Sequence, residues 1–202
     1  MNITEDQKDG LAEVINIGVG RAADSLNRML GTRIEMSPPL VRLLAHDELD
    51  NTIAPEMFGA DICCTYISFD GVIVGKAAFA LPMPDAMNLV SVLTDEPRHS
   101  PELDAVMTDA IKEVGNVIIN NVMGSVADFL KDTVDFTLPG YAKGTAGDVL
   151  KIFAPSKEEV ILFVQATMKV RKFETKADLL LFVHLESFSK LLSAIDRLYT
   201  GE

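Results

Sequence analysis

Apolar residues recur at helical spacing in two long stretches, one near the start of each half of the chain. In the first stretch, from Thr4 to about Leu30, they fall at Leu11, Ile15, Val19, Ala22, Leu26 and Leu30. This spacing is close to the 3.6-residue period of an amphipathic helix. Thr4 and Gln7 predict a capping box at its start, and Gly31 predicts its end. Residues Pro101–Leu130 carry the same helical pattern.

Extended apolar runs predict two long hairpins. The first joins Ala60–Phe69 to Val72–Leu81 through Asp70-Gly71, a dipeptide typical of tight hairpin turns. The second joins Glu159–Val170 to Lys176–Leu185. The remaining elements are short strands at Thr32–Met36, Leu40–Ala45 and Thr133–Thr137, helices at Met83–Leu93 and Ser187–Leu198, polar connections at His46–Asn51 and Thr94–Ser100, and a glycine-containing loop at Gly140–Asp148.

Each half therefore repeats one order of elements: long helix, short strands, long hairpin, helix. One half alone offers a single sheet face and few helices to cover it, so the halves are expected to share one sheet and one core. The fold class predicted is α/β, with two repeats related by a pseudo-two-fold axis. Residues 1–202 are expected to form a single domain, with repeats at about 1–100 and 101–202.

Composition narrows the possible partners and the compartment. The net charge is −12 and 48% of the residues are hydrophobic. An acidic surface repels phosphate backbones and anionic lipids, so we expect no nucleic acid and no membrane surface as a partner. The chain has no run of about 20 apolar residues, so membrane insertion is not expected. The adjacent Cys63 and Cys64 indicate buried packing residues, and the lack of a disulfide framework favours a cytoplasmic location.

One polar pattern occurs twice, at an offset of 100 residues. Asp9, Glu13 and Asn16 are followed by Pro39, and Asp109, Glu113 and Asn116 are followed by Pro139 with the same spacing. In a helix, Asp9 and Glu13 lie about 40° apart and Glu13 and Asn16 about 60° apart, on a stripe that avoids the apolar face. We therefore expect the Glu and Asn side chains to point outward, one turn apart.

A single Glu-x-x-Asn pair is most simply a solvated polar face, but packing gives little reason for the same exposed pair to persist in both repeats. An Asn side chain offers one acceptor and two donors, so it can hold a water molecule although it cannot act as a base. A carboxylate can form an ion pair with a partner's lysine. Gly18 and Gly20 predict a thin surface beside Asn16 where another molecule could approach.

Other kinds of catalytic site have weak support in the sequence. His46, His99 and His184 lack the spacing of metal ligands. The Gly18 and Gly20 pair lacks the third glycine of a dinucleotide-binding loop and falls inside a predicted helix. The paired Glu and Asn thus favour a site that positions water on a phosphoryl group carried by another protein.

The duplicated pattern resembles the Asp/Ser-x3-Glu-x2-Asn-x22-Pro signature of the CheC/CheX/FliY chemotaxis phosphatases, and the first repeat also resembles their Asn-Ile-Gly-x-Gly run. The resemblance implies a CheC-like fold and an enzyme that hydrolyses the phospho-aspartate of a CheY-type response regulator. It assigns Glu13 and Glu113 to contact the regulator's lysine, and Asn16 and Asn116 to orient the attacking water.

The same resemblance gives supporting roles to Asp9, Pro39, Asp109 and Pro139. It implies no cofactor in this chain, with Mg²⁺ held by the partner regulator, and it makes CheD a candidate second partner. Two alternatives stay open at this stage. One is a non-catalytic adaptor for a receiver domain or CheD, and the other is a structural component of a flagellar switch. The second motif helix departs from the glycine-rich run of the first, so the two sites are not expected to be equivalent.

Overall fold

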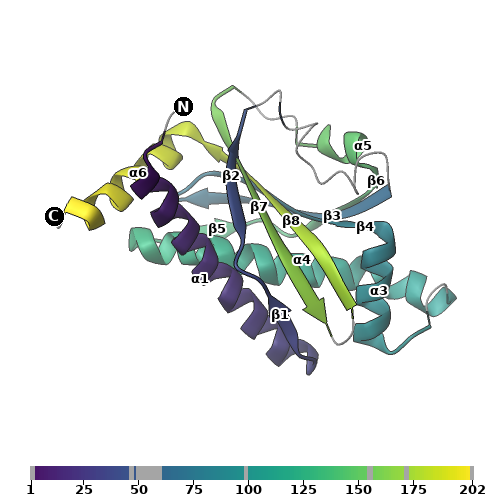
Figure 1. The fold of residues 1–202 in the computed structure, drawn as a ribbon. Helices are drawn as coiled ribbons and strands as arrows, with labels where there is room; N and C mark the ends of the chain where they lie inside the picture. Colours follow the sequence, from purple (N-terminus) through teal and green to yellow (C-terminus); the bar gives the residue numbers. More distant parts are fainter. Residues whose placement is uncertain are drawn as a thin grey trace.

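The computed structural model describes residues 3–45, 48, 61–97, 100–153, 157–170 and 173–200, and the predicted stretch at His46–Asn51 falls almost entirely outside them, as does His99. Two similar series of elements follow each other along the chain, and each begins with a long helix (Figure 1). The elements are α1 (Glu5–Leu30), β1 (Ile34–Met36), β2 (Leu40–Leu44), β3 (Asp61–Gly71), β4 (Gly75–Pro82), α3 (Met83–Thr94), α4 (Pro101–Leu130), β5 (Val134–Phe136), β6 (Gly140–Thr145), α5 (Ala146–Leu150), β7 (Glu159–Val170), β8 (Phe173–His184) and α6 (Leu185–Thr200).

The ends of the first long helix are set by the residues that the sequence indicates. Thr4 accepts a hydrogen bond from the backbone of Gln7, and the Gln7 side chain accepts one from the backbone of Thr4, which completes the predicted capping box. Gly31 ends α1 in the left-handed conformation, with φ of 60°. A glycine adopts this conformation without a Cβ penalty, so the predicted stop is confirmed.

The eight strands in the described ranges form one antiparallel sheet in which the halves interleave. Its main order is β1-β7-β8-β4-β3-β5, with β2 also on β7 and β6 also on β3. The short strands of each half therefore pair with the hairpin of the other half, and β4 pairs with β8 at the centre. This arrangement confirms the predicted fold class, in which two pseudo-symmetric repeats share one sheet.

The predicted turn at Asp70-Gly71 is wrong. The β3–β4 ladder ends at the pair Phe69–Gly75, and Asp70 and Gly71 continue along β5 instead. Gly71 has φ of 121°, and a Cβ there would lie 2.7 Å from the carbonyl oxygen of Thr133. Glycine is needed at this position because the chain passes close to β5, a strand of the other half. Local turn preferences do not reveal this contact.

The predicted loop at Gly140–Asp148 is also wrong, because this stretch forms β6 and the start of α5. The glycines of this stretch are typical of a loop, but β6 is a strand. It pairs with β3, from Asp61 opposite Thr145 to Tyr66 opposite Gly140. At Gly140 a Cβ would lie 2.2 Å from the Tyr66 ring. The glycine therefore makes room for a neighbouring aromatic ring within a strand.

The sheet has a helical layer on each face. Helices α1, α3, α4 and α6 pack on one face, and the short α5 packs on the other. Cys63 belongs to the first core cluster and Cys64 to the second, and both are fully buried, as the alternation of strand side chains predicts. In the described part of the chain, no helix combines the length and apolar character needed to cross a membrane.

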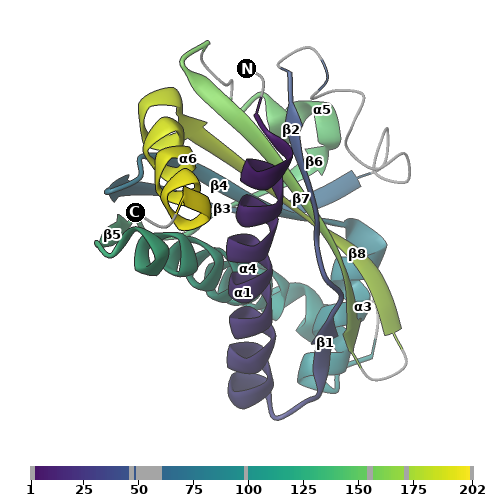
Figure 2. The ribbon, with the colours of Figure 1, turned by 60° about the vertical axis from the view of Figure 1, so that its left-hand side comes forward.

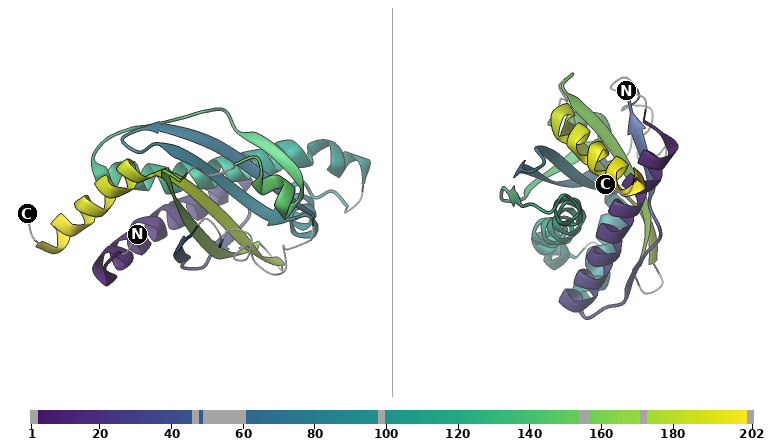
Figure 3. Two further views of the ribbon diagram at one scale, coloured as in Figure 1. Left: turned by 90° about the horizontal axis from the view of Figure 1, so that it is seen from above. Right: turned by 90° about the vertical axis from the view of Figure 1, so that its left-hand side faces the viewer.

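The two long helices cross in contact with each other, and α6 lies beside the N-terminal half of α1 (Figures 2 and 3). Gly18 of α1 faces the backbone of α4, where a Cβ would lie 2.6 Å from Val122 Cα. Polar contacts between exposed side chains flank the crossing, including an ion pair between Arg21 and Asp128. The crossing brings the two helices that carry the repeated motif into direct contact.

Candidate functional site

The first copy of the motif lies on the outer face of α1. Asp9 and Glu13 are exposed and Asn16 is half-buried, whereas Leu11 and Ile15 on the opposite face are buried in the core. The Glu13 carboxylate and the Asn16 carboxamide each come from the middle of a capped helix, so the backbone fixes their relative direction. Asn16 makes no hydrogen bond through its side chain to any other described residue.

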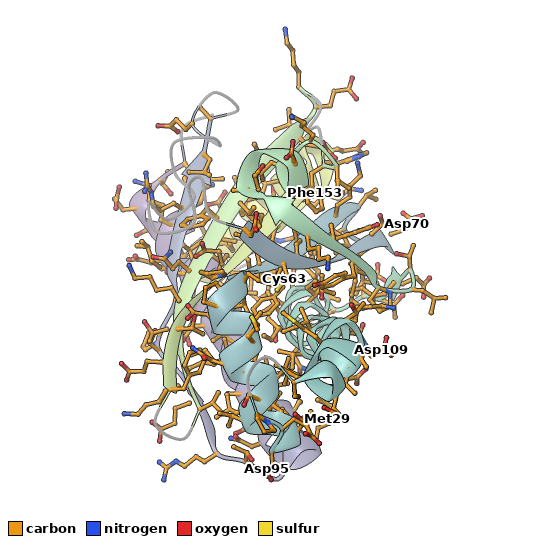
Figure 4. The ribbon with its side chains drawn as sticks, turned by 90° about the vertical axis from the view of Figure 1, so that its right-hand side faces the viewer. Met29, Cys63, Asp70, Asp95, Asp109 and Phe153 are labelled. Carbon is orange, nitrogen blue, oxygen red and sulfur yellow. The ribbon has the colours of Figure 1, made fainter. Side chains whose placement is uncertain are left out.

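The second copy lies on α4 with the same pattern of exposure. Asp109 and Glu113 are exposed and Asn116 is half-buried. Figure 4 places Asp109 on the outer side of α4, away from the sheet. The helical geometry predicted from the spacing therefore holds for both copies, and each presents a carboxylate and a carboxamide one turn apart at the surface.

Each motif proline lies in a one-residue bulge of an edge strand. Between the pairs Met36–Met168 and Leu40–Gln165, the first strand advances four residues while β7 advances three. The second repeat does the same between Phe136–Phe69 and Gly140–Tyr66. A bulge leaves one residue outside the ladder. Proline can occupy this position because it has no N–H to donate.

A hydroxyl two residues before each proline restores the interrupted ladder. Ser37 Oγ accepts a hydrogen bond from the backbone N–H of Thr167 at 2.9 Å. Thr137 Oγ1 accepts one from the backbone N–H of Ser68 at 3.1 Å. Sequence reasoning missed both residues, although a Ser/Thr-x-Pro pattern at the same 100-residue offset was a usable signal.

The interpretation of Gly18 as part of an accessible surface is wrong, because it faces α4 as described above. Gly20 differs, since it is exposed and a Cβ there would meet nothing within 4 Å. Only one of the two glycines therefore leaves space on the outside of the helix beside Asn16.

Buried polar contacts anchor the second motif helix to the sheet. Thr65 of β3 is fully buried and donates from Oγ1 to the carbonyl oxygen of Ile111 at 2.9 Å. At Gly115 a Cβ would lie 2.5 Å from the Thr65 side chain, so the helix lies directly on this strand. Burial also raises the pKa of Tyr141, on the neighbouring strand β6, to about 12. These contacts fix the helix turns that precede Asn116.

The two copies differ in the contacts of their asparagines. Asn120, one turn beyond Asn116, donates from Nδ2 to Asn116 Oδ1 at 3.1 Å. The equivalent position in the first copy is Gly20, which has no side chain. Sequence reasoning assigned Gly20 to a surface that another molecule could approach and gave Asn120 no role.

Of the three histidines, the structure describes His184. His184 lies at the end of the β7–β8 ladder, 3.9 Å from Glu159 Oε1. Within the ranges that the structure describes, no three His, Cys, Asp or Glu side chains are grouped as metal ligands. What each motif face presents is a carboxylate, which suits a cationic partner group, and a carboxamide, which can both donate to and accept from one water molecule.

The fold and the repeated surface define a class of duplicated α/β proteins with a Glu-x-x-Asn pair on each of two crossing helices. The family model for the chemotaxis phosphatase CheX matches residues 63–163, and the model for the CheC-like family matches residues 7–41. These segments contain the helical parts of the second and first motif, respectively. The chain belongs to the CheC/CheX/FliY family of chemotaxis phosphatases.

Individual similar proteins cover between 83% and 98% of this chain. The CheY-P phosphatase CheC of Bacillus subtilis is 25% identical over 96% of this chain and 95% of its own length. Thermotoga maritima FliY has a similar structure, with a TM-score of 0.74, 17% identity and coverage of 98% and 99% of the two chains. A complex of CheX with CheY, BeF3 and Mg²⁺ from Borrelia burgdorferi contains a chain with a TM-score of 0.51 and 18% identity, covering 83% of this chain and 96% of that one.

Proposed function

We propose that this protein hydrolyses the phospho-aspartate of a CheY-type response regulator. The observation that carries the proposal is the presence of two Glu and Asn pairs with equal spacing and equal exposure, one on each motif helix. The whole-length similarity to a CheY-P phosphatase of Bacillus subtilis supports it. The receiver partner is supported by the CheX relative, whose structure contains CheY.

In the proposed reaction, water attacks the phosphorus of the acyl phosphate on the receiver. The new bond joins the water oxygen to phosphorus, the bond from phosphorus to the aspartyl oxygen breaks, and the receiver regains its carboxylate. The two water protons leave on the released inorganic phosphate. Asn16 or Asn116 accepts one hydrogen bond from the water and fixes its direction, a role that an amide also performs in GTPases. Glu13 or Glu113 pairs with a lysine of the receiver and so holds the two proteins in register.

The protein itself would supply position and electrostatics. The Mg²⁺ in this proposal belongs to the receiver, where it offsets phosphoryl charge. Asp9 and Asp109 would add negative charge one turn before each glutamate, and Pro39 and Pro139 would set the bulges described above. We further propose that residues 1–202 act as one domain, because the halves exchange edge strands, and that the protein works in the cytoplasm with its receiver.

The test is phosphate release from phosphorylated CheY of Bacillus subtilis. The double variant Asn16→Ala/Asn116→Ala is expected to lose nearly all acceleration while still binding the receiver. Asn88→Ala is the matched control, because Asn88 is also half-buried in a helix and has no side-chain hydrogen bond to the rest of the described chain. Full activity in the double variant would refute the assignment of the asparagines.

The same assay separates the enzyme from the adaptor alternative. Tight binding of phosphorylated CheY with no acceleration by the unmodified protein would favour an adaptor. CheD stays a candidate partner on the resemblance alone, and adding CheD to the assay tests whether it changes either binding or turnover.

A further inference from the structure

The second site holds its asparagine with a contact that the first site lacks. Asn120 Nδ2 donates to Asn116 Oδ1 at 3.1 Å across one helical turn. The contact uses one lone pair of that oxygen and leaves the second lone pair and both Nδ2 protons of Asn116 available. It also restricts rotation of the Asn116 carboxamide about its terminal torsion, which is otherwise broad.

The first site provides an internal comparison. Asn16 and Asn116 share the same motif spacing and the same half-buried exposure. The position one turn further on is Gly20 in the first copy, and no described side chain hydrogen-bonds Asn16 there. No hydrogen bond from a described residue therefore restrains the Asn16 carboxamide, whereas Asn120 restrains that of Asn116.

A contribution to folding does not account for Asn120. Its Oδ1 is buried and has no hydrogen-bond partner among the described residues. An unpaired buried oxygen is unfavourable, and asparagine is a poorer former of helix interiors than alanine. Asn120→Ala removes both disadvantages, so a purely structural account predicts no loss of stability from this change.

We propose that Asn120 is a positioning residue that orients Asn116 and makes the second site the faster of the two. This inference rests on the proposed phosphatase function. A carboxamide that is already oriented has less rotational freedom to lose when it holds the attacking water. Asn120 acts through Asn116, so it should change turnover rather than the docking of the receiver.

The test removes the contact from one site and builds it into the other. In an Asn16→Ala background only the second site works. There, Asn120→Ala should lower kcat roughly three- to tenfold, which is the scale expected for the loss of one net hydrogen bond. KM should change little. In an Asn116→Ala background, where only the first site works, Gly20→Asn should raise kcat by a similar factor. Gly20 has open space around its Cβ direction, so the new side chain fits.

Gly20→Ala in the Asn116→Ala background is the matched control, since it gives the same helix stiffening without an amide. The kcat of Gly20→Asn should exceed that of Gly20→Ala, and thermal melting should show all of these variants folded. An unchanged kcat in the Asn120→Ala variant, or an equal gain from Gly20→Ala and Gly20→Asn, would overturn the positioning role. These results differ from failure of the proposed function, which would appear as activity that survives loss of both Asn16 and Asn116.

Discussion

Replacing Gly18 by alanine should force the two motif helices apart. The new Cβ would lie 2.6 Å from Val122 Cα and 3.2 Å from the carbonyl oxygen of Asn121. Carbon atoms in contact normally lie about 3.5–4.0 Å apart. Neither neighbour can rotate away, because both belong to the backbone of α4, so α1 must retreat by roughly 1 Å if it keeps normal contacts.

Two opposing contributions set the change in the free energy of unfolding. Overpacking at a close contact of this kind costs about 1–3 kcal/mol. The better helix propensity of alanine offsets about 1 kcal/mol of this. We therefore expect Gly18→Ala to lower the free energy of unfolding by up to about 2 kcal/mol. For a chain of this size each kcal/mol shifts Tm by roughly 2–4 °C.

Gly20→Ala is the control for this prediction, because it changes the same helix two residues away where nothing lies within 4 Å. It should gain about 0.5–1 kcal/mol from propensity alone. The free energy of unfolding of both variants is measured by urea unfolding, followed by circular dichroism. The helix-propensity term cancels in the difference between the two variants. Equal stabilisation by the two alanines would show that Gly18 does not lie at a tight helix crossing.

Three further predictions concern buried and exposed polar groups. Burial raises the pKa of Cys63 to about 12, so a thiol-reactive dye at pH 8 should label native protein far more slowly than urea-unfolded protein. Thr65→Val should cost about 1–2 kcal/mol in urea unfolding, because it removes the buried hydroxyl bonded to Ile111, and no loss would contradict that anchor. Arg21→Ala should change stability by less than about 1 kcal/mol, because its ion pair with Asp128 is exposed, and a larger, salt-independent loss would contradict this.

Features set by local chemistry could be predicted from the sequence. The capping box at Thr4 and the strand Glu159–Val170 appear at their predicted bounds. Caps depend on residues three positions apart, and strand alternation depends on a period of two, so each can be found within a short window. The outward direction of Glu13 and Asn16 is a similar case, because helical periodicity alone sets the face on which they lie.

Features that depend on the partner of a segment could not be predicted in this way. Gly71 looks like half of a hairpin turn, yet its conformation serves pairing with a strand some 60 residues away. Gly18 looks like a gap in a surface, and only the crossing helix shows that the gap is filled. The hydrogen bond from Asn120 lies within local range, but whether a polar helix residue turns toward its neighbour or toward water depends on the burial around it.

Because the repeats exchange edge strands, dividing the chain between them should not separate the two sites. Pro39 precedes β2, which pairs with β7 of the second half, and Pro139 precedes β6, which pairs with β3 of the first half. The strand that follows each motif helix is thus held by the hairpin of the opposite repeat. Deleting one repeat would leave the other with an unpaired edge and an uncovered sheet face. Single substitutions at Asn16 or Asn116 therefore isolate one site, whereas expressing half of the chain should destroy both.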